Sequence, residues 1–147
     1  MQTIDEALAK LKTSDFRAKF HLSKADAAYI EQKGPDVIES HCADFIRTRL
    51  APAVIPNDGK QTPWRGHPVF KAQHACACCC RGCLNKWYRV PKDTVLTENQ
   101  QARIVRLLMA WILRELAVYY EAHPKDRPEH SVLDDVPPVR SATENME

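Results

Sequence analysis

Residues 98–123, ENQQARIVRLLMAWILRELAVYYEAH, form the longest helical pattern in this chain of 147 residues. Thr97 precedes the pattern, and Gln100 lies three residues after Thr97. This capping box predicts the start of a helix. Apolar side chains then recur at helical spacing along one face: Ile104, Leu108, Trp111, Ile112, Leu116 and Tyr119. Between positions 107 and 113 they nearly surround the helix, which predicts a place at the centre of a bundle or in a homodimer contact.

Shorter helical patterns precede this helix. Apolar spacing predicts helices at 4–11, 25–33 and 36–50, and a further one from about 79 to 88. With the long helix, these patterns predict an all-α domain of about five helices that occupies residues 1–122. The chain has only 4 Gly, and this composition also favours helix over sheet.

The last part of the chain differs in composition from the rest. Residues 123–147 contain three basic and six acidic side chains, a net charge of −3, and four prolines, so a disordered tail is expected. The N-terminus lacks the apolar segment of a signal peptide, and no apolar run is long enough to cross a membrane. The expected location is therefore cytoplasmic. Clustered cysteines in that compartment more often bind metal or act in redox chemistry than form disulfides.

The chemistry is concentrated in residues 57–92, NDGKQTPWRGHPVFKAQHACACCCRGCLNKWYRVPK. This stretch holds five of the six cysteines and two of the six histidines, and from Lys60 onward it has seven Lys or Arg and no acidic residue. Because prolines and glycines are frequent between positions 51 and 75, regular structure is not expected over most of that range. Its aromatic and apolar side chains predict an ordered, packed loop rather than a disordered one.

The spacing of cysteine and histidine predicts a metal site, with zinc as the first choice. Cys80 and Cys83 form a C-x-x-C pair, which can direct two sulfurs at one tetrahedral ion. The predicted ligands are His74, Cys80 and Cys83, with Cys79 or His67 as the fourth. Alternatives are an iron–sulfur cluster, thiol–disulfide exchange through the same pair, and cysteines without a ligand.

A second hypothesis is a metal-dependent enzyme, hydrolase-like in its chemistry, with its site in the 57–83 loop. Asp58, Lys60, His67 and His74 would supply acid, base and anion-holding groups. Basic side chains around the cysteines would offset thiolate charge or contact nucleic acid or another phosphate-bearing ligand: Lys60, Lys71, Arg81, Lys86 and Arg89.

The motifs NDGKQTP, GHPVFKAQHA, CCRGCL and KW resemble those of a family of small bacterial proteins known as a domain of unknown function. The resemblance extends from about Ile4 to Leu116 and brings no established activity. It implies a shared set of candidate ligands: His67, His74, Cys79, Cys80 and Cys83. The same resemblance implies weaker roles for Cys76 and Cys78, where relatives have threonine. Relatives often have histidine in place of Tyr88, so a role for that histidine would be lost here or taken by Cys76 or Cys78.

Overall fold

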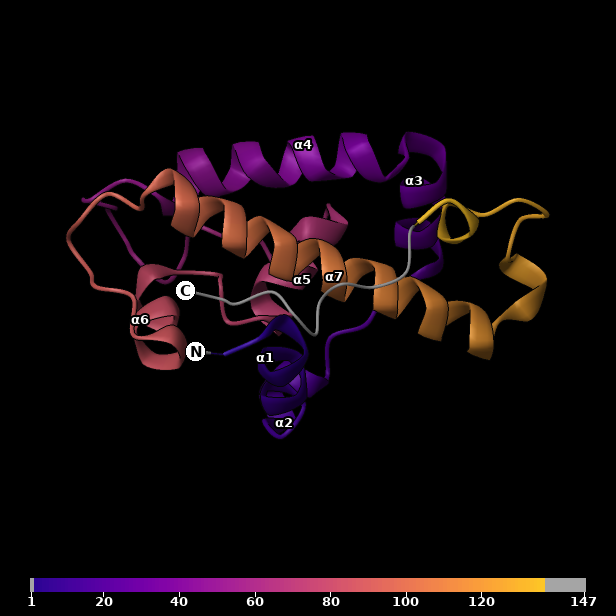
Figure 1. The fold of residues 1–147 in the computed structure, drawn as a ribbon, viewed down its shortest axis with the longest axis horizontal. Coiled ribbons are helices and arrows are strands. Elements are labelled where there is room, and N and C mark those ends of the chain that lie inside the picture. The colour runs from indigo at the N-terminus through magenta and orange to yellow at the C-terminus, as the bar shows by residue number, and fades with distance from the viewer. Residues whose placement is uncertain (1, 137–147) are drawn as a thin grey trace.

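The computed structural model describes residues 2–136, and its regular structure is helical (Figure 1). The α-helices are α1 (Ile4–Leu11), α2 (Asp15–Ala18), α3 (Lys24–Lys33), α4 (Pro35–Phe45), α5 (Pro68–Ala75), α6 (Arg81–Tyr88) and α7 (Glu98–Ala122). A π-helical turn, η1 (Ile46–Leu50), extends α4, and two 3-10 turns follow α7: η2 (Pro124–Asp126) and η3 (Val132–Asp134). The prediction of an all-α fold is confirmed, and α2 and α5 are helices that the sequence patterns did not predict.

Helix α7 forms the centre of the molecule, as its nearly continuous apolar surface predicts. It packs against α1, α4 and α5, with α4 on one side of it and α1 on the other in Figure 1. Leu107, Leu108, Ile112 and Leu116 are completely buried. Thr97 and Gln100 form the predicted capping box at its start. None of the described helices combines the length and the apolar character that a membrane span requires.

The α3–α4 hairpin positions α4, which covers the face of α7 opposite α1. Ser23 and Asp26 form a reciprocal capping box at the start of α3. Gly34 then adopts a φ of 84°, which side chains other than hydrogen rarely allow, and Pro35 begins α4 at once. The predicted helix 36–50 is therefore present, with a change to π-helical bonding at Ile46.

Irregular chain covers residues 51–67, which is most of the range where it was expected, and α5 occupies the rest of that range from Pro68. The His67 side chain accepts a hydrogen bond from the Val69 N–H and caps the helix, and proline suits its first position. Nearly every side chain of α5 is buried, polar ones included. A helix buried on all sides has no amphipathic period, so the sequence pattern that identifies surface helices is absent here.

The first part of the predicted tail packs on α3. Ser131 is completely buried and donates a hydrogen bond to Glu31, at 2.6 Å between the oxygens. The same carboxylate accepts hydrogen bonds from the Val132 N–H and the Tyr120 hydroxyl. Ser131 and Val132 are thus held on α3 by one partly buried carboxylate. Residues 137–147 of the predicted tail lie outside the described part of the chain.

Candidate metal centre

The thiols of Cys79, Cys80 and Cys83 meet where the chain enters α6. Cys80 is the N-cap of this helix, and its sulfur accepts a hydrogen bond from the Cys83 N–H. The Cys83 sulfur lies 3.2 Å from that of Cys80 and 3.6 Å from that of Cys79. All three sulfurs lie within 4.8 Å of one another. Zinc–sulfur bonds of about 2.3 Å place tetrahedral sulfurs about 3.8 Å apart, so this spacing is close to that of a metal site.

Hydrogen bonds from the preceding loop and from α5 fix the chain at the cysteines. The Thr62 hydroxyl donates to the Cys79 carbonyl at 2.8 Å, and the Gln73 amide donates to the Cys78 carbonyl at 3.1 Å. Ala77 has a φ of 58°, which lets the chain reverse between α5 and α6. The backbone that carries the thiols is therefore held in place by protein contacts alone.

Arg17, from α2, is the cation that lies against the thiols. Its guanidinium donates to the Cys83 sulfur at 3.3 Å, to the Cys79 sulfur at 3.7 Å and to the His74 carbonyl at 2.6 Å. The side chain is 9% exposed. The basic sequence around the cysteines predicted that this charge comes from lysines and arginines between 60 and 89. Arg17 was missed because no local motif links it to the cysteines.

These contacts divide the thiols into one acidic and two less acidic groups. The pKa of Cys83 is lowered to about 5, because the hydrogen bond that Cys79 donates, with further ones from Cys80 and Arg17, outweighs partial burial. The hydrogen bond to Cys83, together with burial, raises the pKa of Cys79. Burial raises the pKa of Cys80. The cluster thus favours one thiolate, at Cys83, even before an ion is bound.

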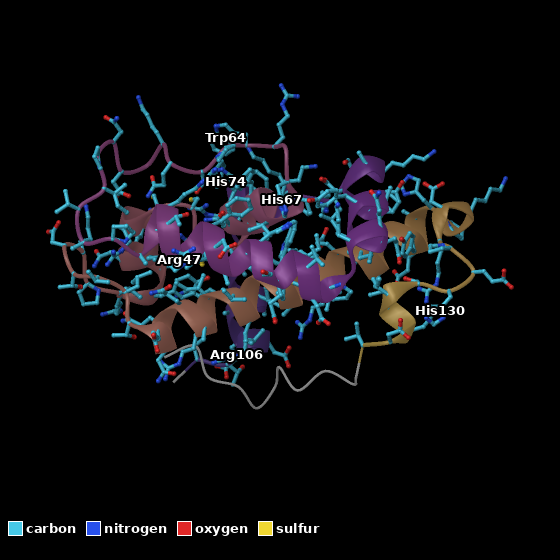
Figure 2. The ribbon with its side chains drawn as sticks, turned by 90° about the horizontal axis from the view of Figure 1, so that it is seen from above. Arg47, Trp64, His67, His74, Arg106 and His130 are labelled. Atoms are coloured by element: carbon cyan, nitrogen blue, oxygen red, sulfur yellow. The ribbon has the colours of Figure 1, made fainter. Side chains whose placement is uncertain are left out.

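His74 lies on α5 with one ring nitrogen engaged and the other unpartnered. Its Nε2 lies 3.1 Å from the carbonyl oxygens of both Thr62 and Pro63, so this nitrogen carries the proton and donates. Nδ1 is buried and has no hydrogen-bond partner in the described structure. The ring stacks on Trp64, with centroids 4.0 Å apart (both are labelled in Figure 2). His74 is not part of the group of three converging thiols.

His67 pairs with His41 and does not join the thiol group. Because its Nδ1 accepts a hydrogen bond from the Val69 N–H at 3.0 Å, the proton of the neutral ring is on Nε2. Nε2 lies 3.1 Å from Nδ1 of His41, to which it donates. Tyr29 and Phe45 enclose the ring with edge-on contacts. His41 was not among the predicted site residues, since its helix explains its position by packing alone.

Burial, with the nearby His41, lowers the pKa of His67 from 6.5 to about 4, although Asp26 acts in the opposite direction. Between pH 6.5 and 4 the unfolded chain binds a proton at this position and the native protein does not. The free energy of unfolding should therefore fall as the pH falls through this range, by about 2 to 3 kcal/mol from this residue. Urea unfolding at pH 7 and pH 4.5, for the wild type and His67→Gln, measures the effect. The same pH dependence in both proteins would contradict it.

The remaining catalytic candidates have other surroundings. Asp58 accepts hydrogen bonds from the N–H groups of Arg81 and Gly82, at 3.0 and 3.1 Å, and so caps α6. Burial raises the pKa of Asp58, but these bonds and one from Gln61 lower it further, so the net shift is downward. Lys60 is exposed. No hydrogen bond within residues 2–136 joins Asp58, Lys60 and His67.

Cys76 and Cys78 are buried in the core and lie outside the thiol group. Both are completely inaccessible, and burial raises the pKa of each thiol. The Tyr88 hydroxyl donates to the Cys76 carbonyl at 2.5 Å. The tyrosine therefore supports the backbone beside the cysteines.

Fold and site together define a small helical protein with a three-thiol cluster that could hold a metal ion. The chain belongs to the family described as a domain of unknown function (DUF4186), whose model matches residues 5–113. This match confirms the family resemblance read from the motifs and includes every cysteine of the chain. No solved structure matches it.

Proposed function

We propose that this protein binds one zinc ion through Cys79, Cys80 and Cys83, with Nδ1 of His74 as the fourth ligand. The observation that carries the proposal is the convergence of three sulfurs at near-tetrahedral spacing. Mixed sulfur and nitrogen ligands in a tetrahedron suit zinc. An iron–sulfur cluster usually takes four cysteines, and here the described group has three.

The hydrogen bonding of His74 supports its role as the fourth ligand. Histidines that bind metals usually donate the other ring N–H to a carbonyl or carboxylate, which fixes the tautomer. Nε2 of His74 does so with Thr62 and Pro63, which leaves a lone pair on the unpartnered Nδ1. A buried polar atom without a partner is costly and calls for an explanation. Ligation would require Nδ1 to approach the thiol group.

The charge of the site also favours a divalent ion. Three thiolates around such an ion leave one negative charge in excess, and Arg17 supplies one positive charge at hydrogen-bonding distance. A buried charge is tolerated when it is paired and hydrogen-bonded. The guanidinium would therefore stabilise the loaded site, and it also favours the thiolate form of the ligands before loading.

Elemental analysis of protein purified without a histidine tag is the direct test. We expect about one equivalent of zinc per chain, since a preformed site of this kind binds tightly. Less than about half an equivalent, in protein with an intact helical circular dichroism spectrum, would contradict the proposal. Titration of the apoprotein with Co²⁺, followed by its sulfur-to-metal charge-transfer absorption, then reports the ligand set.

His74→Ala tests the fourth position. We expect the affinity for Co²⁺ to fall at least about 10-fold. Loss of a residue that only hydrogen-bonds to a metal ligand can already have an effect of this size. His21→Ala is the control, because His21 is exposed and pairs with Glu115. Unchanged affinity in His74→Ala would show a fourth position open to water, as in the metal-dependent hydrolase of the second hypothesis.

Thiol–disulfide exchange is a second candidate, favoured by the 3.2 Å separation of the Cys80 and Cys83 sulfurs. In this reaction the two thiols form a disulfide, and a disulfide substrate takes up the two electrons and two protons to become two thiols. Incubation of the metal-free protein with oxidised glutathione, followed by peptide mass mapping, should yield a Cys80–Cys83 bond. Failure to form it would rule this function out. Binding of nucleic acid remains a prediction of the basic sequence.

A further inference from the structure

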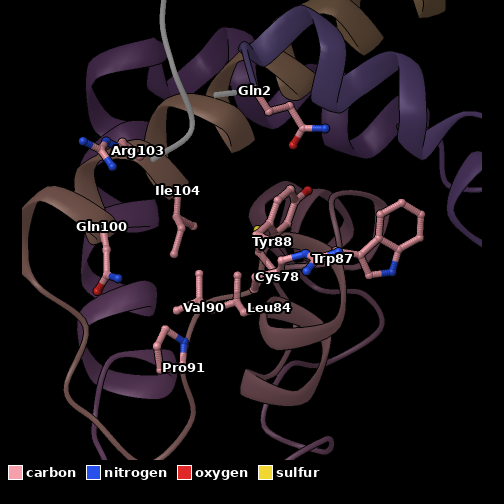
Figure 3. Close-up of a pocket in the computed structure, with 11 residues that line it drawn as sticks. Gln2, Cys78, Leu84, Trp87, Tyr88, Val90, Pro91, Gln100, Arg103 and Ile104 are labelled. Carbon is pink, nitrogen blue, oxygen red and sulfur yellow. The ribbon is translucent and has the colours of Figure 1, made fainter.

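A pocket of about 370 Å³ lies between the end of α6 and the first turns of α7. Figure 3 shows Gln100, Arg103 and Ile104 on one wall, facing Leu84 and Tyr88 on the other. Its volume is at the small end of the range for ligand sites, roughly 300 to 1,000 Å³. The pocket is separate from the sulfurs of the candidate metal centre, none of which lines it.

The charged groups of the pocket are all basic. Arg89 and Arg103 line it, and no acidic side chain is among its described lining residues. Neither guanidinium has a hydrogen bond or an ion pair with another described residue. Two guanidiniums at one small cavity, without a partner among the described residues, attract an anion, because each can form bidentate bonds to a carboxylate or phosphate.

Arg89 occupies a position where glycine is expected. It follows the last residue of α6 with a φ of 58°, in the left-handed region. The Arg89 N–H donates to the Asn85 carbonyl, and the Val90 N–H donates to the Leu84 carbonyl. Helix ends with this pattern of hydrogen bonds usually have glycine at the left-handed position. A side chain in this conformation costs about 1 kcal/mol or more. Arg89 thus occupies a backbone position that glycine would adopt with less strain.

The other walls supply an amide donor and an apolar surface. Gln100 uses its amide oxygen to accept from the Thr97 N–H, which leaves its amide NH₂ free to donate. Leu84, Val90 and Ile104 line the pocket with carbon. This combination of convergent donors with an apolar wall matches a ligand that is charged at one end and apolar at the other.

We propose that this pocket binds a small organic oxyanion, a carboxylate or phosphate monoester attached to an apolar or aromatic group. Arg89 and Arg103 bind the oxyanion, and the aliphatic wall contacts the apolar part. The inference goes beyond the proposed metal binding and does not depend on it, because no proposed ligand lines the pocket.

Isothermal titration calorimetry of the full-length protein, as purified, tests the proposal with phenyl phosphate and benzoate as probes. We expect saturable binding of at least one probe, and the preferred probe identifies the oxyanion. Inorganic phosphate and acetate, which lack the aromatic group, should bind at least 10-fold more weakly. Equal binding of these simple anions would overturn the role of the apolar wall, and no saturable binding of either probe would overturn the proposal.

Two variants assign the binding to this pocket. Arg103→Gln should weaken binding at least 10-fold. Arg89→Gly should weaken it to a similar degree and leave the melting temperature unchanged or raised, because glycine relieves the left-handed backbone. Lys125→Gln removes the same charge from η2 at the other end of α7 and should bind as the wild type does. Wild-type affinity in both arginine variants would overturn the proposal, even if a probe binds elsewhere.

Discussion

Cys83→Ser is expected to reduce bound zinc from about one equivalent to less than about a tenth. Cys83 is the centre of the cluster, since its sulfur is close to both others, at 3.2 and 3.6 Å. A serine hydroxyl is not ionised at neutral pH and is a poor ligand for zinc. Zinc sites in small modules contribute on the order of 10 kcal/mol of folding free energy. Hydrogen exchange across residues 57–92 should therefore become much faster in the variant.

Cys42→Ala is the matched control for a lost thiol. Cys42 lies on α4, is completely buried and is not part of the thiol group. Its replacement should lower stability modestly, by about 1 kcal/mol, because a small cavity is left, and should leave the zinc content unchanged. If Cys83→Ser kept a full equivalent of zinc, or if Cys42→Ala lost it, the assignment of the site would be wrong.

Arg81→Met is expected to lower the free energy of unfolding by about 3 to 5 kcal/mol, or to prevent folding. Arg81 is 3% exposed, and its guanidinium donates to the carbonyls of five residues: Leu50, Ala51, Pro52, Pro91 and Thr94. Leu50 is the last residue of η1 and Ala51 is its C-cap, so neither carbonyl has a partner within that helix, and that of Ala51 also accepts from the Leu96 N–H. Without the guanidinium, the buried Leu50 carbonyl and the part-buried carbonyls of Pro52, Pro91 and Thr94 lose this donor.

Thermal unfolding measures this effect, with a decrease of about 10 to 20 °C expected for a chain of this size. Arg81→Lys keeps the charge but cannot reach all five carbonyls, so an intermediate loss is expected. Arg65→Gln, at an exposed position of the 51–67 loop, is the control and should change the melting temperature little. A melting temperature for Arg81→Met within a few degrees of the wild type would contradict the structural role.

This role corrects the prediction that Arg81 offsets the charge of the thiolates. Its position beside Cys80 in the sequence suggested a contact with the thiols. The side chain is instead directed to the last residue of η1 and to the loop after α6. At the start of a helix, the side chains of residues that are adjacent in the sequence point in different directions. Adjacency of two residues therefore does not predict which charge meets which thiol.

The helices that expose one face to solvent were predictable from the sequence. Their apolar spacing and caps, such as Ser23 with Asp26 and Thr97 with Gln100, are local signals that the structure confirms. Helix α5 was missed because its buried polar groups, Gln73 and His74, interrupt any amphipathic pattern. These two side chains are buried because they bond to the loop before them and to the turn after them, which is information that the local sequence lacks.

The sequence by itself determined the helical fold, the central place of α7 and the pairing of Cys80 with Cys83, while Cys79 and His67 stayed alternatives. Each of these depends on residues a few positions apart, so local geometry suffices. Only the tertiary structure decided that Arg17 meets Cys79 and Cys83, which lie 62 and 66 residues away, and that His67 pairs with His41. Contacts over such separations depend on how the helices pack, and no periodicity of one segment contains that information.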